Sequence, residues 1–120
     1  MTIDRAALAA VLAENFAGEW DIFKETATCF LDSLKENIKT FKLAFATQDV
    51  EAMVRISHRI KGEASLFHKP SVHLKFGEIE ANARKGMMPS RLTFDEAEKD
   101  LFALDTELRE VLSGQFNQSA

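Results

Sequence analysis

The sequence lacks most of the features that mark disulfide-stapled, membrane-spanning and nucleic-acid-binding proteins. A single cysteine, Cys29, allows no internal disulfide and no cysteine metal site, and a place in or beside a core is its ordinary role. No apolar run approaches the roughly 18 residues that a membrane-spanning helix needs. Charged residues, among them Arg5 and Glu14, interrupt the N-terminal apolar pattern, unlike in a signal peptide. A net charge of −4 argues against nucleic acid as the main partner, and a cytoplasmic protein is the simplest expectation.

Residues that break helices are also scarce. The 120 residues include five glycines, two prolines and no tyrosine, but ten phenylalanines. Such a composition favours long helices over short strands joined by turns. The length predicts one domain over residues 1–120, and the initial Met1 and a polar tail over 115–120 suggest a free-standing protein.

The apolar residues recur at spacings of three and four, which is the period of an α-helix. In the first long segment they are Trp20, Phe23, Ala27, Phe30, Leu34, Ile38, Phe41 and Phe45. The whole pattern predicts a short N-terminal helix at about 4–16 and four longer helices at about 20–46, 49–68, 71–85 and 94–112. We therefore expect an all-α fold, an antiparallel up-down four-helix bundle with a short additional N-terminal helix.

The predicted boundaries follow from capping and helix-stopping residues. Asp49 is a good N-cap for the second long helix, and Pro70 ends that helix because the residue before proline avoids helical angles. Gly86 is a plausible C-terminal stop for the third. Thr93 and Glu96 have the spacing of a capping box for the fourth.

One face of the second long helix does not look like ordinary solvated surface. At 100° per residue, His58 lies about 160–200° from the core residues Ile56 and Ile60, so it points to solvent. Gly62 lies about 40° from His58 and costs the helix about 1 kcal/mol relative to alanine. Lys61 lies one turn from the histidine. An exposed neutral imidazole is a nucleophile, Lys61 can offset charge on a phosphoryl group, and Gly62 leaves room for a partner's backbone.

A carboxylate on the following helix is a candidate partner for the imidazole. If the chain folds back at residues 69–70, position 58 lies level with about position 81. Glu80 falls there, and its carboxylate can accept a hydrogen bond from the second ring nitrogen and fix the tautomer. The alternative role for Glu80 is that of a solvated surface charge.

The segment HRIKG at residues 58–62, with Phe67 nine residues after the histidine, closely resembles a known signature. This signature, H-x-L/I-K-G followed by L/F-G, belongs to histidine-containing phosphotransfer (HPt) domains. The lead-in over residues 49–57 is similar to that of the family, and Glu80 falls where the family has a polar or acidic residue. The resemblance covers nearly the whole chain in helix order and length, and its specific part is residues 58–67.

The resemblance implies a phosphoryl carrier. His58 would accept a phosphoryl group from a receiver-domain aspartate and pass it to another, Lys61 would support the phosphoryl charge, and Gly62 would give access. The partners would be response-regulator receiver domains and a histidine or hybrid kinase, with no nucleic acid and no membrane. Since HPt domains have no kinase activity and Mg²⁺ sits on the response regulator, no cofactor and no metal site are expected. The expected partner-docking surface consists of Val54, taken as an exposed valine, with Arg55, Arg59, Ser65 and Leu66.

Two residues depart from the family pattern. Glu63 stands where a small residue is usual, and it adds a negative charge about 140° round the helix from His58. His68 replaces a glycine at the helix end, where histidine is tolerated as a cap. His68 and His73 have no ligand spacing with His58, so we interpret them as a cap and a surface residue.

Other functions remain open from the residues. The chain can be a receiver-binding module without phosphotransfer, or the dimerisation and phosphoacceptor domain of a histidine kinase. In the kinase domain an acidic residue normally follows the acceptor, whereas Arg59 follows here, and that domain is a dimer. An HPt bundle is complete as a monomer, which is the expected state. A metal or haem bundle is a distant further possibility because no set of inward-facing ligands is present.

Overall fold

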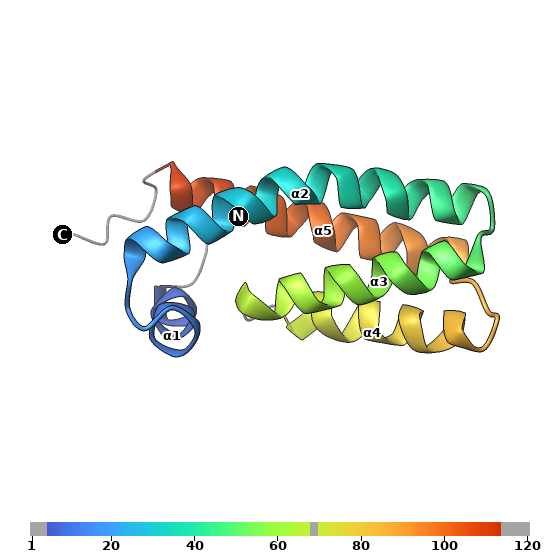
Figure 1. The fold of residues 1–120 in the computed structure, drawn as a ribbon, viewed down its shortest axis with the longest axis horizontal. Helices are drawn as coiled ribbons and strands as arrows, with labels where there is room; N and C mark the ends of the chain where they lie inside the picture. The colour runs from blue at the N-terminus through green and yellow to red at the C-terminus, as the bar shows by residue number, and fades with distance from the viewer. Residues whose placement is uncertain (1–4, 68–69, 114–120) are drawn as a thin grey trace.

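The computed structural model describes residues 5–67 and 70–113, and Figure 1 shows their arrangement. In these ranges all regular structure is helical, which confirms the all-α class. The elements are α1 (Arg5–Asn15), α2 (Trp20–Ala46), α3 (Val50–Ala64), the 3₁₀ turn η1 (Ser65–Phe67), α4 (Pro70–Arg84) and α5 (Arg91–Leu112). None of the described helices is long and apolar enough to cross a bilayer.

The four longer helices lie side by side along the long axis of the molecule (Figure 1). Helix α3 packs on α2 and α4, and α5 also packs on α2 and α4, so the four helices enclose one core. Helix α1 lies across one end of the molecule, where it contacts η1. This arrangement puts α3, which carries His58, directly beside α4, which carries Glu80.

The buried seam of α2 follows a seven-residue repeat more closely than the sequence reading assumed. Its buried members are Phe23, Ala27, Phe30, Leu31, Leu34, Asn37, Phe41 and Ala44. The prediction had placed Ile38 and Phe45 in the seam, but both are only half-buried, and Asn37 and Ala44 take those positions. Alternating steps of four and three average 3.5 residues per turn, which keeps one line of side chains facing the neighbouring helices from Phe23 to Ala44.

Helix capping explains where α3 and α5 begin. Asp49 Oδ1 accepts a hydrogen bond from the Ala52 amide at 3.0 Å and starts α3. Ser90 Oγ accepts from the Thr93 amide at 3.1 Å, so α5 begins at Arg91. The predicted start at 94 with a Thr93 capping box was therefore wrong. Ser90 already has the extended backbone of an N-cap, and Thr93 lies inside the first turn that it caps.

The ends of α3 and α4 also differ slightly from the predicted bounds. Helix α3 ends at Ala64 and tightens into the 3₁₀ turn up to Phe67, whereas the prediction continued it to 68. Helix α4 starts at Pro70 itself, one residue earlier than predicted, because proline is well suited to the first helical position. After α4, Gly86 adopts a φ of +83°, and its amide and that of Met87 bind carbonyls of the last turn.

An aromatic cluster joins α1, α2 and the turn that follows α3. The ring of Phe67 lies within 5.1–6.3 Å, centroid to centroid, of the rings of Phe16, Phe23 and Phe30. Beside it, Asn15 Nδ2 donates a hydrogen bond to the Leu66 carbonyl at 2.9 Å. This end of the core therefore depends on one side chain from η1.

We predict that Phe67→Ala lowers the free energy of unfolding by about 3–5 kcal/mol, because it leaves a cavity among three rings. Phe102→Ala is the matched control, since Phe102 is half exposed on α5 and should change stability by about 1 kcal/mol or less. Urea unfolding followed by circular dichroism measures both. Equal losses for the two variants would contradict the role assigned to the cluster.

Candidate functional site

His58 lies on the exposed face of α3. Its side chain is 65% exposed, whereas Ile56 and Ile60 on either side point into the core. Because the apolar seam fixes how α3 is rotated, the imidazole is held out toward solvent while its helix stays packed on α2 and α4.

One nitrogen of this exposed ring meets a buried carboxylate from α4. His58 Nδ1 lies 3.0 Å from Glu80 Oε2, and Glu80 is only 5% exposed. An ionised carboxylate only accepts hydrogen bonds, so Nδ1 carries the proton and donates. In the neutral ring the other nitrogen, Nε2, then keeps its lone pair. The sequence placed Glu80 level with His58, but it left open whether the carboxylate is a solvated surface charge. The structure shows that it is buried.

Two cations converge on the same carboxylate. Lys61 Nζ lies 2.9 Å from Oε1, and Arg84 places Nη2 at 2.7 Å and Nε at 3.2 Å from Oε2. The hydrogen bond from Lys61, with those from Arg84 and His58, lowers the pKa of Glu80 from 4.5 to about 2, although burial acts in the opposite direction. Glu80 is therefore a charged acceptor at neutral pH. Arg84 was missed by the sequence reading.

Two glycines adjoin this cluster, one on each helix. A Cβ added at Gly62 would meet no atom within 4 Å, so no close contact inside the molecule requires glycine there. A Cβ added at Gly77 would lie 3.4 Å from Lys61 Cδ, so the lysine stem runs across α4 at this glycine. Sequence reasoning missed Gly77, although its place one turn before Glu80 on the same helix was a usable signal.

The described residues contain no group of three or more His, Cys, Asp or Glu side chains that could hold a metal ion. Comparison with protein families shows a match to the Hpt domain over residues 25–114, three quarters of the chain. The chain belongs to the Hpt domain family. The resemblance drawn from HRIKG is thus confirmed, while no curated protein and no solved structure gives a significant match.

Family membership assigns the general role. Hpt domains are phosphoryl carriers in the phosphorelays of two-component signalling, and they interact with histidine kinases and receiver domains. The matched range contains His58 and Glu80 together with α3, α4 and α5, whereas α1 lies outside it.

The Hpt domain's unusual Glu63 faces away from the histidine. Asn37 Nδ2 on α2 donates to the Glu63 carboxylate at 3.2 Å, and Asn37 is only 2% exposed. The sequence reading placed Glu63 on another side of α3 but did not find its partner. The signal was a polar residue in the apolar seam of α2, between Leu34 and Phe41.

The residues expected to form the docking surface are spread along α3 and η1. Arg55 and Arg59 are exposed, and Leu66 is 39% exposed. Val54 is half-buried against the core, which corrects its description as an exposed valine, because α4 covers part of it. Ser65 is exposed, but its hydroxyl donates to the Gly62 carbonyl at 2.7 Å.

Of the other histidines, His73 lies apart from the cluster around Glu80. His73 is exposed on α4, with Nδ1 3.5 Å from the Lys61 carbonyl. The expected cap at His68 lies outside the described residues.

We predict that Glu80→Gln removes stability in a pH-dependent way. Because folding lowers the pKa of Glu80, its contribution is fully present above about pH 4.5 and disappears as the pH falls through about 2. At pH 7 the loss should be about 1–2 kcal/mol, since all three partner side chains can turn toward water. Urea unfolding between pH 7 and 2 measures the difference from wild type, with the exposed Glu25→Gln as control. A difference that stays constant with pH would contradict the ion-pair account.

Proposed function

We propose that the chain is a phosphorelay intermediate that carries a phosphoryl group on Nε2 of His58 between aspartates of receiver domains. The observation that carries this proposal is the 3.0 Å hydrogen bond between Nδ1 of the exposed ring and the buried Glu80 carboxylate. It fixes the tautomer in which Nε2 is unprotonated. No other described histidine has a carboxylate partner of this kind.

The transfer needs no proton movement at the histidine. The Nε2 lone pair attacks the phosphorus of the receiver's aspartyl phosphate, the N–P bond forms, and the P–O bond to the aspartate breaks as the carboxylate leaves. The ring keeps its Nδ1 proton and becomes positively charged. Glu80, ionised at neutral pH, stabilises that charge through the same hydrogen bond. Return of the phosphoryl group to another aspartate reverses each step.

Lys61 and Gly62 have separate roles in this proposal. Lys61 is 30% exposed and pairs with Glu80 in the free protein, so a short rotation of its terminal bonds brings the ammonium to the phosphoryl oxygens. Gly62 keeps the surface one turn after His58 free of side-chain atoms, which allows the receiver's active-site loops to approach. The docking surface around them consists of Val54, Arg55, Arg59, Ser65 and Leu66.

The proposal also covers the bundle topology, the oligomeric state and the absence of kinase activity. We expect the four long helices to act as an antiparallel up-down bundle that is complete as a cytoplasmic monomer. The chain would have no kinase activity of its own and no cofactor, because the Mg²⁺ and the acceptor aspartates belong to the receiver domain.

The decisive experiment is phosphotransfer from phosphorylated receiver domains to the purified chain. We expect the wild type to gain a phosphoryl group that is labile in acid and stable in alkali, as a phosphoramidate bond is, and His58→Gln to gain none. Lys61→Ala should slow transfer about tenfold or more through lost charge stabilisation. Receiver binding that persists in His58→Ala, with no transfer to the wild type, would instead indicate an inactive interaction module. A stable dimer that is phosphorylated directly from ATP by a kinase domain would indicate the kinase dimerisation domain.

Gly62 gives a prediction in which stability and activity move in opposite directions. Gly62→Ala should raise the free energy of unfolding by about 0.5–1 kcal/mol, because an added methyl group meets no neighbour and alanine favours the helix. Transfer from a phosphorylated receiver should nevertheless slow, and it should slow further in Gly62→Gln. Urea unfolding and single-turnover transfer measure the two effects. Unchanged transfer in both variants would show that the glycine is not needed for access.

A further inference from the structure

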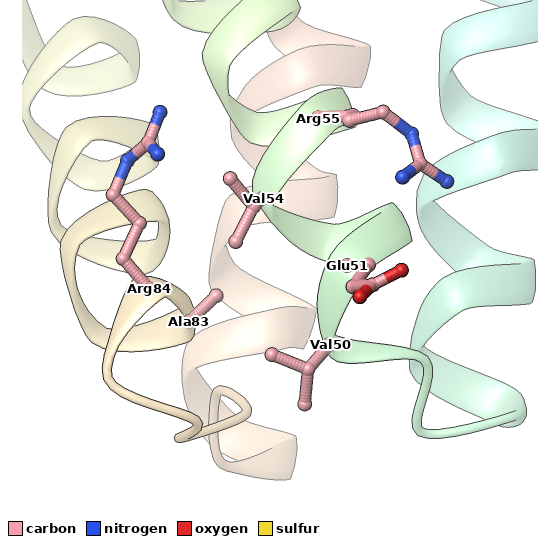
Figure 2. A pocket seen from close by; sticks show the side chains of 6 residues that line it. All are labelled: Val50, Glu51, Val54, Arg55, Ala83 and Arg84. Carbon is pink, nitrogen blue, oxygen red and sulfur yellow. The ribbon is translucent and has the colours of Figure 1, made fainter.

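An open groove of about 420 Å³ separates α3 from α4 near the start of α3. Figure 2 shows Val50, Val54 and Ala83 at its centre, with the Arg84 guanidinium on the α4 side, while the Arg55 side chain extends from α3 toward α2. Val54 is one helical turn before His58, so the groove continues directly from the face that carries the imidazole.

Arg84 belongs both to this groove and to the histidine cluster. Its guanidinium donates two hydrogen bonds to Glu80 Oε2, the same oxygen that lies 3.0 Å from His58 Nδ1. Its side chain is nevertheless 59% exposed, so a group in the groove can reach it. The same oxygen, Glu80 Oε2, therefore accepts hydrogen bonds both from the imidazole and from Arg84, which a partner can contact.

The charges around the groove favour an acidic occupant. Arg55 and Arg84 line it. Glu51 is the one acidic residue among the lining side chains. This local excess of positive charge stands against a net charge of −4 for the whole chain. The complementary ligand has a carboxylate beside an apolar side chain.

We propose that the groove binds an acidic side chain and an adjacent apolar side chain of the receiver domain, and that the acidic group draws Arg84 away from Glu80. The apolar side chain would lie on Val50, Val54 and Ala83. Once Arg84 leaves, Oε2 accepts from His58 alone, so Glu80 stabilises more strongly the positive charge that develops on the ring as Nε2 bonds to phosphorus. Docking would thus activate the histidine. This inference rests on the proposed function, and Arg84 is a positioning residue in it.

The other charged groups near His58 do not provide the same link. Lys61 pairs with the opposite oxygen, Oε1, at 2.9 Å. From α2, Asn37 binds Glu63 rather than the imidazole. Arg84 alone joins Oε2 to the groove among the described residues.

The first test needs no partner. Phosphoramidate is a small phosphoryl donor: Nε2 bonds to its phosphorus, the P–N bond breaks, and the amine takes a proton from water and leaves as ammonia. We expect Arg84→Gln to be phosphorylated about two- to fivefold faster than Lys85→Gln, a control that removes an equal charge one residue away. Arg84→Lys should restore a rate near wild type. Equal rates for Arg84→Gln and Lys85→Gln would overturn the link to His58.

A second readout uses the ring itself. ¹⁵N NMR of the imidazole should show a larger Nδ1–H population and slower exchange of this proton with water in Arg84→Gln than in Lys85→Gln. A structural effect of the substitution alone would not shift the tautomer, because Arg84 is exposed and pairs with Glu80 of its own helix at i,i+4. An unchanged ring spectrum would also overturn the link.

The last test uses a phosphorylated receiver domain. Arg84→Gln should raise KM severalfold relative to Lys85→Gln, and an unchanged KM would overturn the groove as the docking site. The result separates the two proposals. If no receiver transfers to the wild type, the proposed function fails, while the phosphoramidate and NMR comparisons still decide the role of Arg84. If receivers transfer equally well to all variants, only the inference about the groove fails.

Discussion

The site depends on one buried negative charge. Glu80 is almost inaccessible to water, and a carboxylate there is tolerated only because three donors surround it. Two of them, His58 and Lys61, come from α3, and Arg84 comes from the same helix as Glu80. The imidazole is exposed enough to react, yet the carboxylate that orients it is shielded from water, so their hydrogen bond is stronger than at the surface.

This charge also fixes the register of α3 against α4. A shift of either helix by one residue would turn Glu80 away from both His58 and Lys61 and leave a buried carboxylate short of donors. The apolar seams specify the same register, because Ile60 and Phe76 are both fully buried. The Lys61 stem crosses α4 at Gly77, where an added Cβ would lie 3.4 Å from Lys61 Cδ. Packing and electrostatics therefore agree at the site.

Sequence reasoning succeeded where the position of a residue depends mainly on the geometry of its own helix. The helical period placed Ile56 and Ile60 inside and His58 outside, and counting residues back from the turn put Glu80 level with the histidine. It failed where the outcome depends on contacts between helices: the burial of Glu80, its pairing with Arg84 and the stem of Lys61 over Gly77. No spacing rule shows that three donor side chains will share one carboxylate. The predicted start of α5 was wrong for a local reason. Ser90 and Thr93 both have side chains suited to an N-cap, and the prediction chose Thr93 instead of Ser90.

Glu63 and Asn37 show how a departure from the family pattern is accommodated. A small residue at position 63 would leave the Asn37 amide buried in the seam of α2 without its acceptor, which costs about 1–3 kcal/mol. A leucine at position 37 would leave Glu63 half-buried without its donor. The two polar residues thus require each other. Because their contact lies toward α2, the carboxylate of Glu63 is held away from the face where His58 meets Glu80. The sequence anomaly beside the histidine is therefore explained by the packing of a different helix pair.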